Sequence, residues 1–170
     1  LCGQIKGDLV IKWSENSVLS VGNRNYKIPQ FDFNYFHFDE VEGVVSFRLN
    51  IPISSSVDEK SLLISNVVYE DVSDAALGDL SKDKIPQGLT SFVKNSNARD
   101  LKFAALQVTP IIRQGVAFKR VKSFSYSLKV GSNSQVVQKR GFDEVSNSVL
   151  STGDWYRFYV EKSGVYKLSK

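Results

Sequence analysis

The sequence is poor in the residues that most often carry chemistry: its 170 residues include one cysteine, one histidine and no methionine. A lone cysteine excludes a disulfide within the chain. No apolar run approaches the roughly 18 residues that a membrane-spanning helix requires, so we expect no direct membrane span. Because the sequence begins at Leu1 without a methionine, it predicts a processed chain or an excised part of a longer one.

Cys2 lies in the opening "LCG" and has two interpretations. It is either an incidental thiol in a frayed terminus or a lipid-anchoring cysteine at the end of a removed signal peptide.

The single histidine limits catalysis and metal binding. His37 lies in "FHFDEVE" near Asp39, Glu40 and Glu42, but one imidazole beside carboxylates in mixed phase is a weak pattern for a metal site. A serine or cysteine peptidase would need His37 as its base, and no serine lies in a recognisable nucleophile turn. Glycine-rich phosphate loops are also absent. The sequence therefore predicts no catalytic, cofactor-binding or metal-binding residue in this chain, and no cofactor.

Period-two alternation dominates what is present. In "GVVSFRLNI" the residues Val45, Phe47, Leu49 and Ile51 share one face, and "KSFSYSLKV" repeats the pattern with Phe124, Tyr126, Leu128 and Val130. Such segments are typical of strands with one face in a core and one in water. A chain with 42% hydrophobic and 24% charged residues is long enough to bury such a core without a disulfide or a metal.

Other segments are less regular. "FDFNYFHFD" (31–39) changes phase, which predicts a β-bulge or a strand that passes between two sheets. "DLVIKW" (8–13) and "SLLISNVVY" (61–69) are continuously apolar, which predicts strands covered on both faces. Residues 73–100 are expected to be mostly a long polar loop, with one or two helical turns capped by Ser73 or Asp74 and weakened by Gly78.

These elements predict an all-β fold, an antiparallel β-sandwich or open barrel, over residues 1–130. The polar, Gly- and Ser-containing residues 131–147 are expected to form a linker or a long surface connection. Residues 148–170 are expected to form a β-hairpin that begins the next unit of a parent chain. The dibasic pair Lys139–Arg140 in the linker is either a cleavage point for a trypsin-like protease or a solvated charge pair.

Charge is polarised along the chain. Residues 1–93 carry eight basic and thirteen acidic side chains, a balance of −5, whereas residues 94–140 carry ten basic residues and one acid, a balance of +9. Basic strands with aromatic residues can bind single-stranded nucleic acid. Because Phe124 and Tyr126 alternate with serines as core residues do, we expect no nucleic-acid partner. The basic residues considered for that role are Arg113, Lys119, Arg120, Lys122 and Lys129.

Two stretches carry a resemblance to a known family. Residues 109–130 end in a basic-to-aromatic strand, and "NSVLSTGDWYRFYVEKSGVYKLS" (147–169) follows. In this order they resemble the N-terminal region of sortases of the type IX secretion system, relatives of the gingipain-type cysteine peptidases. Thr152 and Arg157 depart from the family pattern. The matching residues are Ser148, Leu150, Ser151, Gly153, Trp155, Tyr156, Gly164, Val165, Tyr166, Lys167 and Leu168.

The resemblance implies a non-catalytic, gingipain-propeptide-like domain of an exported protein at the surface of a Gram-negative bacterium. Its implied partner is its own downstream catalytic domain, which would hold the catalytic Cys and His, with other secretion-system components at the outer membrane as further candidates. The family's propeptides act as folding aids and as blockers of the active-site cleft. The 73–100 loop and the linker around Lys139 and Arg140 are the expected contact sites.

Two other functions fit the sequence. A β-sandwich adhesion or carbohydrate-binding module would need exposed aromatic residues on a flat face, for which Trp13, Tyr35 and Tyr69 are the candidates. A docking scaffold would instead use the −5 and +9 regions as oppositely charged faces.

Overall fold

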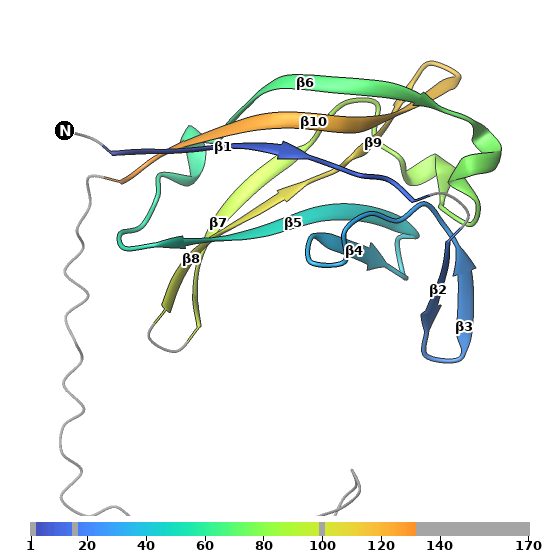
Figure 1. Cartoon of the computed structure of the whole chain (residues 1–170), viewed down its shortest axis with the longest axis horizontal. Coiled ribbons are helices and arrows are strands. Elements are labelled where there is room, and N and C mark those ends of the chain that lie inside the picture. Colours follow the sequence, from blue (N-terminus) through green and yellow to red (C-terminus); the bar gives the residue numbers. More distant parts are fainter. Residues whose placement is uncertain (1–2, 15–16, 99–100, 132–170) are drawn as a thin grey trace, which may run out of the picture. The chain divides into compact units, whose positions relative to one another are not determined.

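A computed structural model of the chain describes residues 3–14, 17–98 and 101–131. Its strands form two four-stranded antiparallel sheets and one two-stranded hairpin (Figure 1). The β10 sheet has the order β1 (Gln4–Val10), β10 (Ala117–Lys129) and β6 (Leu63–Val72), with β9 (Ile111–Gln114) also paired to β10. The β8 sheet has the order β4 (Phe36–Asp39), β5 (Val44–Ile53), β8 (Leu101–Val108) and β7 (Ser91–Ala98), and the hairpin joins β2 (Val18–Val21) to β3 (Arg24–Lys27).

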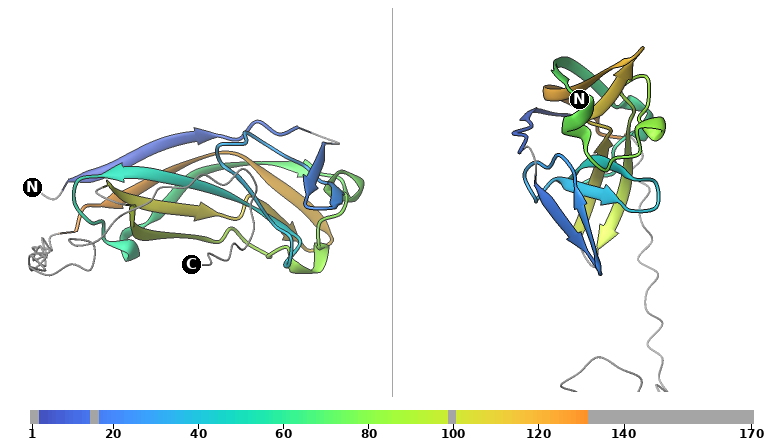
Figure 2. Two further views of the ribbon diagram at one scale, coloured as in Figure 1. Left: turned by 90° about the horizontal axis from the view of Figure 1, so that it is seen from below. Right: turned by 90° about the vertical axis from the view of Figure 1, so that its right-hand side faces the viewer.

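The two sheets are the layers of a β-sandwich (Figure 2). Alternation places Phe124, Tyr126 and Leu128 of β10 in the core, as predicted. Phe47 and Ile51 of β5 face them from the other sheet, and the rings of Phe47 and Phe124 meet edge to face at 5.5 Å. The predicted all-β fold is confirmed.

A second buried cluster closes one end of the sandwich. Val45 of β5 and Ile111 of β9 belong to this cluster. They pack with Ile28, which follows the β2–β3 hairpin, and with the segment between β6 and β7. The apolar residues of that segment are Leu77, Leu80 and Ile85, all buried.

The prediction of a long polar loop over residues 73–100 is wrong. The segment contains two 3-10 helices, η2 (Asp74–Leu77) and η3 (Lys82–Lys84), and then strand β7. Asp79 fixes it to the hairpin, because its carboxylate accepts the backbone N–H of Lys27 at 2.6 Å and its own N–H donates to the Lys27 carbonyl at 3.0 Å. The predicted cap is confirmed: the Ser73 hydroxyl accepts the Ala76 N–H, and Gly78 ends η2 with a φ of +56°.

The prediction for residues 8–13 and 61–69 also needs correction. β1 and β6 are not covered on both faces: they are the outer strands of the β10 sheet, and Val10 and Leu63 are exposed. β6 also bends, because Asn66 adopts a φ of +51° where the pairing with β10 shifts register. Asn tolerates this left-handed conformation better than most residues.

The phase change in residues 31–39 comes from a turn rather than from a bulge or a strand that changes sheets. The backbone N–H groups of Tyr35 and Phe36 both donate to the Asp32 carbonyl at 3.0 Å, and β4 begins only at Phe36. Phe31, before this turn, is buried and packs edge to face against Phe36 at 5.1 Å.

Several predicted features lie outside the described residues: Cys2, the linker from residue 132 onward with Lys139 and Arg140, and the hairpin over 148–170. Among the residues that are described, no helix has the length and apolar character needed to cross a bilayer.

Candidate docking face

The outward side of the β8 sheet is the surface best suited to a partner. Strands β5, β8 and β7 alternate, so that Ile51, Leu106 and Val93 enter the core while the intervening residues point away from it. These outward residues, here called the cationic face, are Arg48, Asn50, Pro52, Phe92, Lys94, Ser96, Leu101, Phe103, Ala105 and Gln107.

Strand register brings its charged and aromatic residues together. Gln107 of β8 is paired with Phe92 on one side and with Arg48 on the other. The Arg48 Nε donates a hydrogen bond of 3.0 Å to the Gln107 Oε1. The Lys94 ammonium lies 5.8 Å from the centre of the Phe92 ring, within cation–π range.

Within β5, β8 and β7 the charge on this face is of one sign, but Asp39 of the neighbouring strand β4 is near enough for the Arg48 cation to help lower its pKa. None of the residues of the cationic face is a carboxylate, and neither Arg48 nor Lys94 forms a salt bridge with a described residue.

The outward side of the β10 sheet differs. There the Ser125 hydroxyl donates to the Asp8 carboxylate at 2.6 Å and accepts from the Asn66 amide at 3.2 Å. On that side the Asp8 carboxylate shares the surface with the exposed cations Lys6 and Lys129, so both signs of charge are present.

One end of the cationic face is apolar. Leu101, a large hydrophobic residue at this end, is 63% exposed. Phe92 is 47% exposed but lies toward the other end of the face, beside Gln107. A shallow hollow of about 580 Å³ opens beside Leu101, lined by Pro52, Ile53, Ser54, Leu101, Lys102 and Phe103. Exposed apolar surface next to polar groups is typical of protein-binding surfaces.

The histidine and its acidic neighbours do not converge on one site. The Asp39 carboxylate accepts the N–H groups of Val41 and Glu42 at 3.0 Å, and the Glu42 hydrogen bond is the main cause that lowers the pKa of Asp39. Glu40 accepts the Tyr26 hydroxyl at 2.6 Å, and Glu42 pairs with Lys84 at 3.3 Å. In residues 3–14, 17–98 and 101–131, no group of three or more His, Cys, Asp or Glu side chains could hold a metal ion.

His37 itself lies on β4, paired with Ser46 of β5. Partial burial is the largest cause that lowers its pKa, the Arg48 cation lowers it further, and Asp39 opposes both. A neutral imidazole at neutral pH follows, which adds no charge to the neighbouring cationic face.

The three aromatic candidates for carbohydrate binding are packed into the fold. Trp13 donates its Nε1–H to the Val121 carbonyl at 2.8 Å and packs edge to face on Phe31 at 4.9 Å. Tyr35 stacks on Phe47 at 5.1 Å, and Tyr69 packs against the core. All three are partly buried and packed against the core, which does not favour the carbohydrate-binding interpretation.

The oppositely charged sequence regions do not form separate faces. β10, from the basic region, lies between β1 and β6 of the acidic region. Arg120 is 8% exposed, donates to Glu70 at 2.6 Å and lies 5.4 Å from the Trp13 ring. Lys122 is also 3.6 Å from Glu70, so part of the polarised charge is neutralised inside the fold.

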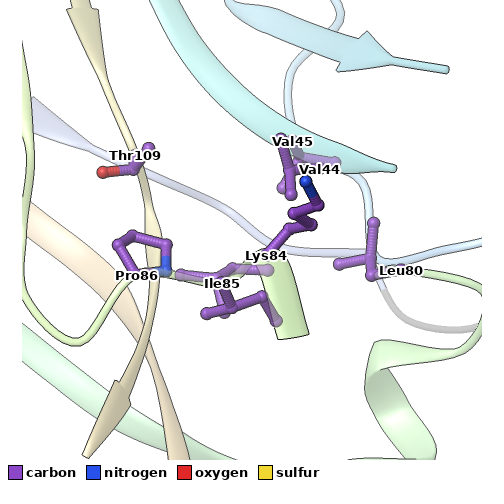
Figure 3. A pocket seen from close by; sticks show the side chains of 8 residues that line it. Val44, Val45, Leu80, Lys84, Ile85, Pro86 and Thr109 are labelled. Atoms are coloured by element: carbon purple, nitrogen blue, oxygen red, sulfur yellow. The ribbon is translucent and has the colours of Figure 1, made fainter. Parts of the chain in front are cut away.

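A small apolar cavity lies under the segment that precedes β7 (Figure 3). Val44 and Val45 line it from β5, with Leu80, Lys84, Ile85, Pro86, Thr109 and Ile111 around them. Its volume of about 40 Å³ suits a methyl group or a few waters but no larger ligand.

Sequence reasoning did not identify the cationic face. The alternation of β5 and β8 pointed Arg48 and Gln107 outward, but only strand pairing brings them beside Phe92 and Lys94 of β7. Searching the sequence for outward aromatic and basic residues without acids would have found part of it.

Comparison with known proteins identifies no family for this chain. No family model and no curated protein matches the sequence. A solved structure with a similar chain trace is the complex of the Porphyromonas gingivalis RgpB pro- and mature domains. The match has a TM-score of 0.48 and 9% identity, and covers 76% of this chain and 80% of the other. At that level of similarity the match carries no argument about function.

Proposed function

We propose that this chain is a non-catalytic, propeptide-like β domain that binds a gingipain-type cysteine peptidase domain, and specifically that of the type IX secretion sortase PorU. The observation that carries the binding role is the cationic face, where Phe92 and Leu101 are exposed and Arg48 and Lys94 form no salt bridge with a described residue. The choice of partner rests on the resemblance of residues 109–130 and 147–169.

The proposed role is regulation of access to the catalytic domain or assistance in its folding. Residues 73–90 are poorly suited to reach into a cleft, because Leu77, Leu80 and Ile85 are buried. Docking of a rigid sheet face on the catalytic domain is therefore more consistent with this fold than insertion of a loop into the active-site cleft. The exported, cell-surface location is part of the same proposal.

A docking scaffold within the secretion apparatus is the second candidate, since the cationic face would serve that role equally well. The carbohydrate-binding alternative has no such support, because Trp13, Tyr35 and Tyr69 pack internally.

The test is binding of the 170-residue chain to a separately produced PorU-type catalytic domain. We expect a saturable 1:1 complex with a dissociation constant in the micromolar range or below, as is typical of specific protein pairs. Absence of binding at high micromolar concentration would contradict the proposal. Binding only to other secretion components would favour the scaffold.

A further inference from the structure

We infer that the cationic face binds an acidic surface of its protein partner, with an apolar side chain of that partner seated in the hollow beside Leu101. The inference rests on the proposed function, since it describes the surface that the catalytic domain must present.

The arginine is positioned for this role. The hydrogen bond from its Nε to Gln107 holds the Arg48 side chain across the strands. The other guanidinium N–H groups form no hydrogen bond with a described residue and can therefore donate to a carboxylate of the partner. A guanidinium that is already oriented loses less entropy on binding than a freely rotating side chain.

Lys94 supplies a second point of attraction at a fixed spacing. Lys94 is paired with Ala105 of β8, and Arg48 is paired with Gln107, two residues farther along the same strand. β8 lies between β7, which carries Lys94, and β5, which carries Arg48. With strands about 4.8 Å apart and about 3.3 Å per residue, the Cα atoms of Arg48 and Lys94 lie about 12 Å apart. Two carboxylates on one strand pair or one helix of a partner can span that distance.

The apolar end of the face lies next to Lys94 and farther from Arg48. Phe103 is two residues from Ala105, so the hollow lies about 7 Å along the strand from the Lys94 row. Apolar contacts that exclude water from neighbouring charge pairs are the usual arrangement of binding hot spots. The exposed area of Phe92 and Leu101 would be buried in such a complex.

A protein fits this face better than a nucleic acid does. Nucleic-acid affinity depends on many phosphate contacts along a basic track. Here the face has two outward cations beside a mostly apolar hollow, which Lys102 also lines. The neighbouring outward residues Asn50, Ser96 and Ala105 are uncharged. An acidic protein surface satisfies both features.

The experiment compares two double variants of the full chain with the same change in net charge. Arg48→Glu with Lys94→Glu reverses the cationic face. Lys12→Glu with Lys60→Glu is the matched control, because both lysines are exposed, lie outside that face and form no salt bridge with a described residue. Affinity for the catalytic domain is measured by calorimetry at about 50 and 300 mM NaCl, where salt screening differs strongly.

We expect the face variant to bind at least about tenfold more weakly at low salt, while the control stays within about threefold of the wild type. Because the new carboxylates would repel an acidic surface, added salt should strengthen binding of the face variant, whereas it weakens binding of the wild type. Leu101→Ser is expected to weaken binding severalfold without changing the salt dependence, because it removes apolar contact only. Thermal melting checks that the variants fold.

The outcomes separate the two proposals. If the catalytic domain binds and both double variants behave alike, the acidic-surface inference is wrong and the proposed function stands. If the wild-type chain does not bind the catalytic domain at all, both are wrong.

Discussion

The ring of Tyr126 lies across the backbone of Gly7, its partner on the neighbouring strand. A Cβ atom at position 7 would meet the Tyr126 Cε1 at 2.5 Å and its hydroxyl oxygen at 2.7 Å. Tyr126 is buried, so the ring has little room to move aside. The absence of a side chain at position 7 therefore lets β1 close over this ring.

We predict that Gly7→Ala lowers the free energy of unfolding by about 1–3 kcal/mol, the usual cost of overpacking. The control is Gly88→Ala, because a Cβ there has no atom within 4 Å and Gly88 is not in a left-handed conformation. Urea denaturation of both variants measures the difference. Equal stability of the two variants would show that the ring yields to the added methyl group.

Trp13 provides a test of the packed role assigned to it. Trp13→Phe keeps an aromatic ring but removes the hydrogen bond to the Val121 carbonyl, which should cost about 1–2 kcal/mol of stability. Phe33→Leu, at a residue that is 89% exposed, should change stability by less than about 0.5 kcal/mol. A Trp13→Phe variant as stable as the wild type would reopen the carbohydrate-binding role for this residue.

We predict that the ion pair of Glu70 makes the stability of the fold depend on pH. The hydrogen bond from Arg120 is the largest cause that lowers the pKa of Glu70 from its ordinary value of 4.5, against the opposing effect of burial. A carboxyl whose pKa is lower in the folded state binds fewer protons there than in the unfolded state. Its contribution to stability is therefore full above pH 4.5 and is lost as the pH falls through the folded pKa.

Glu70→Gln should accordingly lower stability at pH 7 by about 1–2 kcal/mol, since a charge-assisted hydrogen bond at a partly exposed site is lost. In the variant, the free energy of unfolding should also fall less steeply than in the wild type as the pH drops below 4.5. Asp71→Asn is the control, because Asp71 is also acidic but has no hydrogen bond or ion pair with a described residue. Acid-denaturation curves that coincide for wild type and Glu70→Gln would contradict this account.

The cavity beside Val45 predicts a stabilising change. Val45→Ile adds one methylene where about 40 Å³ is empty, which should raise stability by about 0.5–1 kcal/mol. Val41→Ile, at an exposed turn residue, should have no measurable effect. A loss of stability on Val45→Ile would mean that the new methyl group cannot reach the cavity.

The sequence predicts well those features of this protein that depend on residues close together in the chain. The alternation of β5 and β10 follows from period-two burial, and the Ser73 cap follows from hydrogen bonding within four residues. Strand β7 was missed because most of its residues are exposed, so no alternation marks it. Leu77, Leu80 and Ile85 were missed because a folded segment buries them without any regular period.

The candidate site depends on the non-local part of the fold. Arg48, Phe92 and Gln107 meet only because β5, β7 and β8 pair in one register, and that register leaves no trace in any short window of sequence. Individual residues could be assigned to an outward face, but their meeting on one surface could not be predicted.

The central claim is that the cationic face is where a PorU-type catalytic domain docks. It is tested most directly by thiol labelling of two single-cysteine chains, both in a Cys2→Ser background. Ser96→Cys places a thiol on the cationic face, and Lys6→Cys places one on the outward side of the β10 sheet; both positions are exposed. We predict that saturating catalytic domain slows labelling at position 96 and leaves position 6 unchanged. Protection at position 6 with full reactivity at position 96, in a complex that forms, would contradict the account.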